Sequence, residues 1–192
     1  MIVKNIKYLE TIKCDDYQVY NLQYHKQRIA DTIGININLE EYIYPISNKL
    51  LRCRVVYSSN GIESIEYIPY HKKQVKTFKL IYDDNIVYDK KYLNRTYLDN
   101  LYAQKDKYDE IIIIKDDLVT DTSIANIAIW YEDNWITPKC PLLYGTTRQR
   151  YIDNKILQEK NITVQMLKSA SKIALLNAMI DFTEIDKMEI KC

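Results

Sequence analysis

The chain has 192 residues, enough for one substantial core or two smaller ones, and its 27 basic and 26 acidic side chains give a net charge of +1. This balance excludes the basic surface of a nucleic-acid-binding or membrane-binding protein, and apolar runs such as 111–114 are far shorter than the roughly 20 residues that span a bilayer. Four scattered cysteines and two histidines predict neither a metal site nor a disulfide framework, and we expect a cytoplasmic protein because the N-terminus has no signal-peptide pattern.

The first part of the chain predicts a small lobe of mixed strands and helix. Its expected elements are strands at 7–13 and 17–20, a helix at 22–33, and strands at 51–57 and 62–68. Asn60-Gly61 between the last two strands is a strong hairpin signal. The polar segment 69–74 follows and is interpreted as the join between two lobes, at 1–71 and 72–192.

The second part predicts a larger lobe in which strands and helices are again mixed. In chain order we expect a strand at 75–81, a helix near 92–104, a buried strand at 110–114, a polar turn at 119–126, a hairpin at 127–137, a helix from about Thr147, a strand near 162–165, a helix at 166–172 and a strand at 173–177. Recurring hairpins without a regular alternation of strand and helix predict an α+β fold.

Four local patterns carry candidate chemistry, at 25–28, 91–95, 119–126 and 143–149. In the last of them, Gly145 permits a close approach of the backbone, and the N–H groups of Thr146 and Thr147 would open a helix whose dipole attracts anions. An ordinary helix cap by threonine explains the same residues. Taken alone, Lys91 is explained as a surface lysine and Asp121 as a turn residue.

The combination is more informative than its parts. In chain order it reads His25…Arg28, Lys91…Asn94, Thr120-Asp121…Ser123…Asn126, Thr137-Pro138 and Gly145-Thr146-Thr147-Arg148, with weaker matches at 9–12 and 170–178. This ordered set resembles the class IV aminotransferase family, the fold-type IV enzymes that use pyridoxal 5′-phosphate (PLP). The resemblance covers most of the chain and implies the two-lobed α+β architecture of D-amino acid aminotransferase.

The resemblance implies a role for each matching residue. Lys91 would be the catalytic lysine, forming the Schiff base with PLP and then shuttling a proton. Asp121 would contact the pyridine nitrogen, where family members usually have the longer glutamate. The other implied cofactor-binding residues are Arg28, Thr146 and Thr147 for the phosphate, Asn177 and Ala178 in the last phosphate loop, and Leu143 against the ring.

Arg54 is a candidate for binding the substrate carboxylate. It shares a face of its strand with Arg52 and Val56, so either arginine could point toward a bound substrate. A solvated charge on an edge strand explains the same residue.

The function implied is a PLP-dependent enzyme that acts on a small amino substrate. The string Lys91-Tyr92-Leu93-Asn94-Arg95 favours a 4-amino-4-deoxychorismate lyase, which releases 4-aminobenzoate and pyruvate. An amino-acid aminotransferase of the branched-chain or D-amino acid type remains an alternative. The short first lobe and the aspartate at 121 leave a PLP-binding protein with weak catalysis as another. A homodimer is expected, because a small first lobe gains stability from a partner.

Overall fold

The computed structural model of the chain describes residues 6–185 and 189–191. The chain divides into two compact units. Unit 1 contains the described residues up to Lys72 together with Lys90–Asn94, and unit 2 contains Lys73–Asp89 and the described residues from Arg95 onward. The expected second lobe, 72–192, therefore differs from unit 2 chiefly in residues 90–94, which pack with the first unit.

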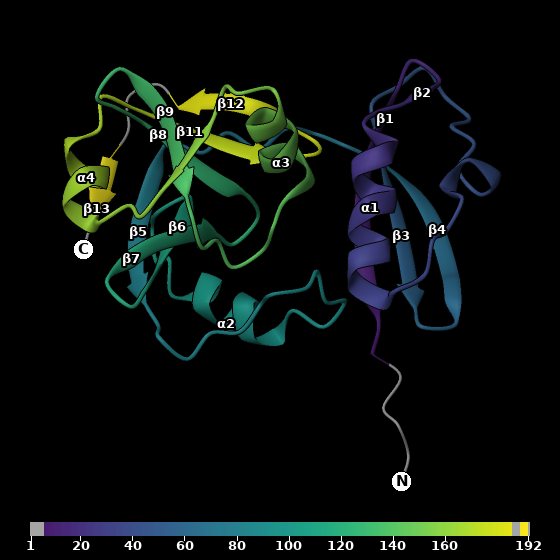
Figure 1. Cartoon of the computed structure of the whole chain (residues 1–192), viewed down its shortest axis with the longest axis horizontal. Helices are drawn as coiled ribbons and strands as arrows, with labels where there is room; N and C mark the ends of the chain where they lie inside the picture. The colour runs from purple at the N-terminus through teal and green to yellow at the C-terminus, as the bar shows by residue number, and fades with distance from the viewer. Residues whose placement is uncertain (1–5, 186–188, 192) are drawn as a thin grey trace, which may run out of the picture. The chain divides into compact units, whose positions relative to one another are not determined.

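Unit 1 is an antiparallel sheet with a helix on one face (Figure 1). Its strands lie in the order β2-β1-β3-β4, and its elements are β1 (Tyr8–Asp15), β2 (Gln18–Val19), α1 (Leu22–Ile33), the short 3-10 helix η1 (Leu39–Glu41), β3 (Leu51–Ser58) and β4 (Gly61–Pro69). Alternate residues of the strands, among them Ile12, Cys53 and Val55, pack with Ile29 of α1 to form the core. The predicted helix at 22–33 is confirmed, as is the hairpin whose turn contains Gly61 at a φ of 106°.

Residues 90–94 add a short stretch of pairing to the edge of β1. The Leu9 N–H donates to the Lys91 carbonyl at 2.9 Å, and the Leu93 N–H donates to the Lys7 carbonyl at 2.9 Å. Because these main-chain groups are used by β1, they cannot form helical bonds. The expected helix near 92–104 was therefore too long at its start, and α2 spans Thr96–Ala103.

Unit 2 is built on a sheet of nine strands among the described residues. Its strands are β5 (Thr77–Tyr82), β6 (Glu110–Lys115), β7 (Leu118–Thr122), β8 (Asn126–Tyr131), β9 (Asn134–Pro138), β10 (Gln158–Lys160), β11 (Lys172–Asn177), β12 (Asp181–Ile185) and β13 (Glu189–Lys191). They run in the order β10-β9-β8-β7-β6-β5-β13, and β11 pairs with both β8 and β12. The four isoleucines at 111–114 are fully buried, as expected of a central strand covered on both faces.

Besides α2, unit 2 contains the helices α3 (Thr146–Asp153) and α4 (Val164–Ser169). Two expectations for this half were wrong, and some of its strands were not predicted. The segment 119–126 is not all turn, because its first part is the buried strand β7. No strand covers 162–165, where α4 begins, and the parallel strand beside β9 is β10. A strand after the turn at 178–180, β12, was not predicted at all.

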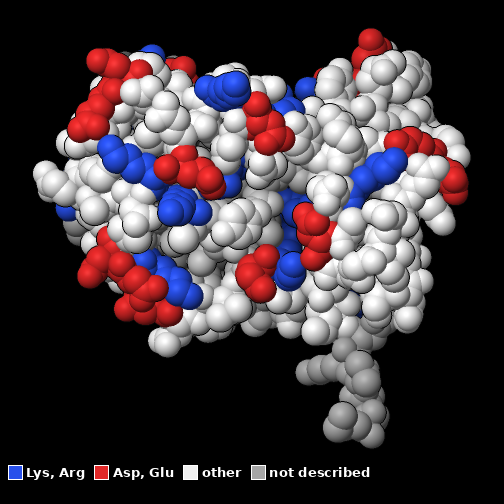
Figure 2. All heavy atoms as spheres, viewed as in Figure 1, with Lys and Arg blue, Asp and Glu red and all other residues white. Residues whose placement is uncertain are grey.

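The mixed α+β fold class is confirmed. None of the helices within residues 6–185 and 189–191 has the length and apolar character to cross a membrane. Figure 2 shows acidic and basic side chains lying next to one another over the face that it presents, in keeping with the net charge of +1.

Candidate functional site

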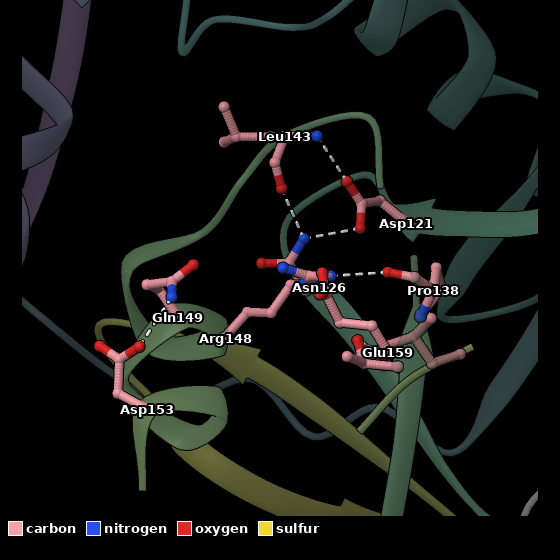
Figure 3. Close-up of polar contacts among 10 residues, drawn as sticks. Asp121, Asn126, Pro138, Leu143, Arg148, Gln149, Asp153 and Glu159 are labelled. Atoms are coloured by element: carbon pink, nitrogen blue, oxygen red, sulfur yellow. Dashed lines mark hydrogen bonds and ion pairs between the residues drawn. The ribbon is translucent and has the colours of Figure 1, made fainter. Parts of the chain in front are cut away.

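Asp121 is the centre of a buried polar cluster at the end of β7 (Figure 3). Its Oδ1 accepts a hydrogen bond from Asn126 Nδ2 at 2.7 Å, and its Oδ2 accepts one from the Leu143 N–H at 2.9 Å. Asn126 Nδ2 also donates to the Leu143 carbonyl at 2.8 Å. The carboxyl is thereby fixed to the loop that leads into α3, and the predicted residues Asp121 and Leu143 are brought together.

Burial dominates the electrostatics of Asp121. Loss of water around the carboxylate raises its pKa to about 6, although the hydrogen bonds from Leu143 and Asn126 and the charge of Arg148 act in the opposite direction. The side chain therefore carries a carboxylate that its own surroundings do not fully stabilise. A cationic partner at this position would be favourable.

Gly145 is the N-cap of α3, so the interpretation of threonine as the cap is wrong. A Cβ at Gly145 would lie 1.9 Å from Asn126 Oδ1, which explains why glycine is needed here. Thr146 and Thr147 occupy the first two helical positions and are both buried. Their N–H groups have no acceptor among the described residues, so this helix start can accept an anion.

Arg148 follows these threonines and is fully buried. Its Nη2 donates to the Pro138 carbonyl at 2.8 Å and to Glu159 Oε1 at 2.6 Å (Figure 3). The arginine of the Gly-Thr-Thr-Arg pattern therefore ties α3 to β9 and β10. The motif itself gave no indication of this structural role.

Asn177 and Ala178 lie where β11 ends and a turn begins. Asn177 Nδ2 donates to the Ile124 carbonyl at 3.2 Å, and its Oδ1 accepts from the N–H groups of Met179 at 2.9 Å and Ile180 at 3.1 Å. The side chain thus connects this turn to the one that follows Asp121. The predicted last phosphate loop is in this way attached to the same end of the sheet as the Asp121 cluster.

Arg28 lies in unit 1 and is held by Glu10, a residue to which the sequence assigned no chemical role. Arg28 Nε donates to Glu10 Oε1 at 2.8 Å, and Arg28 Nη2 donates to Glu10 Oε2 at 2.5 Å. His25 Nδ1 lies 2.6 Å from Glu10 Oε2. Position 10 belonged to one of the weaker family matches, and the His-x-x-Arg spacing puts both α1 partners on one side of the helix, but only the fold shows that the three residues meet.

The charges of this cluster are arranged around Glu10. Burial alone would raise the pKa of Glu10, but the Arg28 charge and the hydrogen bonds from His25 and Arg28 outweigh it and hold the pKa at about 2. Burial lowers the pKa of His25, and the charges of Arg28 and Lys91 add to that effect against the opposing influence of Glu10. The ionised carboxylate therefore faces an arginine and a neutral imidazole that donates through Nδ1.

Lys91 and Arg54 also belong to unit 1. Lys91 is half-buried on the short stretch paired with β1. Arg54 donates from Nη1 to Glu66 Oε2 on the neighbouring strand at 3.0 Å. Of the predicted site residues, unit 1 thus contains Arg28, Arg54 and Lys91, and unit 2 contains Asp121, Leu143, Thr146, Thr147, Asn177 and Ala178.

Comparison with known proteins gives a consistent picture. The family model for class IV amino-transferases matches residues 62–188. A Haemophilus influenzae protein of uncharacterised function is 33% identical over 181 residues, which cover 88% of this chain and 96% of that protein. The crystal structure of a candidate 4-amino-4-deoxychorismate lyase from Haemophilus somnus is 32% identical, with a TM-score of 0.84 and coverage of 92% of this chain and 98% of that one.

A more distant structure shows the same fold. A candidate amino-acid aminotransferase from Mesorhizobium loti is 17% identical, with a TM-score of 0.78 and coverage of 97% of this chain and 100% of that one. The family match covers well over half of the chain, and the ordered residues described above lie on the fold that these structures share. The chain is therefore a member of the class IV aminotransferase family, whose enzymes depend on PLP.

Proposed function

We propose that the chain binds PLP and acts on an amino substrate as a lyase of the 4-amino-4-deoxychorismate type, forming 4-aminobenzoate and pyruvate. The observation that carries the proposal is the buried Asp121 carboxyl, which is hydrogen-bonded to the same loop that opens α3. A phosphorylated pyridine ring needs two fixed points, an acceptor for its nitrogen and an anion site for its phosphate. In unit 2, Asp121 at the end of β7 is a candidate for the first, and the loop that opens α3 is a candidate for the second.

The donors and acceptors in this part of the chain fit PLP. The N–H groups of Thr146 and Thr147 have no acceptor among the described residues and open a helix of eight residues, as a phosphate requires. A carboxylate has about four lone-pair sites, and the hydrogen bonds from Asn126 Nδ2 and the Leu143 N–H occupy two of those of Asp121. Because burial raises the pKa of Asp121, a protonated ring nitrogen would stabilise its ionised form.

When bound, PLP supplies an electron sink for the carbon that carries the substrate amine. Asp121 would keep the ring nitrogen protonated, and Lys91 would hold the cofactor covalently and move a proton at the substrate carbon. Arg28, whose Nε and Nη2 donate to Glu10, would contribute its positive charge to the phosphate site. Leu143 would pack against the ring, while Asn177 and Ala178 would complete the phosphate loop.

Two observations support the lyase over an aminotransferase. The string Lys91-Tyr92-Leu93-Asn94-Arg95 favours the lyase pattern. The Haemophilus somnus protein, which is 32% identical over nearly its whole length, is described as a candidate for this activity. A homodimer is part of the proposal, and sedimentation velocity on the purified protein would test it.

The test begins with the cofactor. We expect the protein to take up PLP with a visible absorbance band, and borohydride should fix the cofactor to Lys91. Lys91→Ala should abolish this adduct, while Lys90→Ala should retain it. Release of pyruvate from 4-amino-4-deoxychorismate would support the lyase, and formation of a keto acid from an amino acid would support the aminotransferase. A folded protein that takes up no PLP would refute both.

A further inference from the structure

The imidazole of His25 has one ring nitrogen that its own cluster does not use. Its Nδ1 lies 2.6 Å from Glu10 Oε2, and both side chains are fully buried. Its Nε2 is also buried and has no hydrogen-bond partner among the described residues. A buried polar atom without a partner is destabilising and uncommon in folded proteins, so we expect a further group to meet this nitrogen in the working protein.

Glu10 decides what kind of group Nε2 can bind. Burial raises the pKa of Glu10, but the charge of Arg28 and the hydrogen bonds from His25 and Arg28 outweigh it, and the pKa is about 2. An ionised carboxylate only accepts hydrogen bonds, so Nδ1 of His25 must carry the proton. Burial lowers the pKa of His25, which keeps the imidazole neutral. Nε2 therefore presents a lone pair, and its partner must be a donor.

Lys91 is a donor in the right part of unit 1. The charges of Arg28 and Lys91 both act on His25, but Arg28 directs its Nε and Nη2 at Glu10. The Lys91 carbonyl accepts from the N–H of Leu9 at 2.9 Å, so Lys91 lies beside the residue that precedes Glu10. A lysine ammonium group has three donors on a flexible stem. It can therefore give one to His25 and keep its other partners.

We propose that His25 is a positioning residue for Lys91, whose amine donates a hydrogen bond to His25 Nε2 while Glu10 holds the imidazole in the required tautomer. The inference rests on the proposed function, because it takes Lys91 as the lysine that moves the substrate proton. The hydrogen bond limits the positions open to the amine whenever the amine is not joined to the cofactor. That is the state in which the lysine transfers a proton, and transfer depends on a fixed geometry.

The charged and titratable groups around His25 come from four elements. Glu10 on β1, Arg28 on α1 and Lys91 on the segment paired with β1 all act on its imidazole, and the phenol of Tyr57 on β3 interacts with Glu10 and Arg28. Because the charge of Lys91 lowers the pKa of His25, removal of that charge should raise the pKa. The pKa of His25 thus reports on Lys91, as does the environment of Nε2.

Nitrogen NMR on protein labelled with ¹⁵N-histidine tests the contact, because the chain has two histidines and the other one, His71, is exposed. The full chain without PLP is used, so that the Lys91 amine is not joined to the cofactor. We expect His25 to show a protonated Nδ1 and an unprotonated, hydrogen-bonded Nε2. Lys91→Met should move the Nε2 resonance downfield and raise the pKa of His25. Lys90→Met, the matched control, should change neither, and unchanged His71 signals would exclude a general loss of structure.

Two replacements of His25 test its role in positioning. Asparagine places an amide N–H where Nδ1 donates to Glu10 and leaves no group at Nε2, whereas glutamine can place an acceptor oxygen near Nε2. In the PLP-loaded protein with 4-amino-4-deoxychorismate, we expect His25→Asn to lower kcat about tenfold or more with little change in KM. His25→Gln should recover part of that loss. A purely structural histidine predicts the opposite order, because asparagine keeps the bond to Glu10.

The outcomes separate this inference from the proposed function. If Lys91→Met leaves the Nε2 resonance where it is in the wild type, or if His25→Asn is fully active, the inference is overturned, while a borohydride adduct at Lys91 would still support the proposed function. If the Nε2 resonance depends on Lys91 but borohydride fixes no PLP there, the proposed function fails and the hydrogen bond between His25 and Lys91 stands.

Discussion

The replacement Glu10→Gln tests the charge cluster of unit 1. Glu10 is fully buried and receives hydrogen bonds from Arg28 Nε, Arg28 Nη2 and His25 Nδ1 at 2.5–2.8 Å. Glutamine keeps the shape of the side chain but removes its charge, and it turns one acceptor oxygen into a donor that faces other donors. Arg28 would be left without its anion on a largely buried surface.

The expected loss can be worked out from the pKa of Glu10. The shift from 4.5 to about 2 corresponds to about 3 kcal/mol of folding free energy, at 1.36 kcal/mol per pKa unit. Removal of one partner from a buried ion pair typically costs about 3–5 kcal/mol, which agrees. Because the pKa is lowered in the folded state, this stability is present above pH 4.5 and is lost as the pH falls toward 2.

Urea denaturation followed by circular dichroism measures the effect. At pH 7 we expect Glu10→Gln to lose about 3 kcal/mol of unfolding free energy, and below pH 4.5 the gap to the wild type should narrow. The matched control is Glu40→Gln, which breaks an exposed pair with Lys26 at 2.9 Å and should leave the unfolding free energy nearly unchanged, because solvent screens the pair. The reasoning is refuted if both variants lose the same amount, or if Glu10→Gln keeps the full acid sensitivity of the wild type.

Two further predictions concern unit 2. Gly145→Ala should cost about 1–3 kcal/mol in urea denaturation, because its Cβ would displace the Asn126 side chain from Asp121 and Leu143; an unchanged midpoint would mean that Asn126 moves without loss. Burial raises the pKa of Asp121 from 3.8 to about 6, so its contribution to stability is present below pH 3.8 and is lost as the pH rises through 6. Asp121→Asn should remove that pH dependence of stability, which amounts to about 3 kcal/mol. Thermal unfolding of the PLP-free protein between pH 4 and pH 8 measures it, and identical pH profiles for the wild type and the variant would contradict the prediction.

Local signals in the sequence were sufficient for part of the fold. The apolar stripe of α1 and the Asn60-Gly61 turn depend on residues close together in the chain, and both elements form as predicted. Strand β7 was missed because its Thr-Asp-Thr residues read as a turn, whereas their polar groups are satisfied by distant partners such as the Leu143 N–H. Burial of such residues depends on tertiary contacts that a local pattern does not contain.

Part of the candidate site could likewise be predicted from the sequence, and part could not. Asp121, Leu143 and the start of α3 were named from their order in the sequence, and they do meet in unit 2. The role of Glu10 could not be seen, because its partners on α1 are 15 and 18 residues away and contact it only after the sheet has formed. The buried Nε of Arg52, which has no acceptor among the described residues, could not be predicted either. The absence of a hydrogen-bond partner is visible only when the neighbouring residues are in place.

The pairing of residues 90–94 with β1 makes the position of Lys91, the lysine proposed to hold PLP, a question of register. Lys90 and Lys91 are chemically identical, and the alignment of Lys91 with Leu9 decides which of them donates to the Asp31 carbonyl on α1. Insertion or deletion of one residue in the loop before Lys90 could be absorbed there without disturbing either core. If it shifted this pairing by one position, however, a residue other than Lys91 would lie opposite Leu9, although an ammonium group would still be present in the segment.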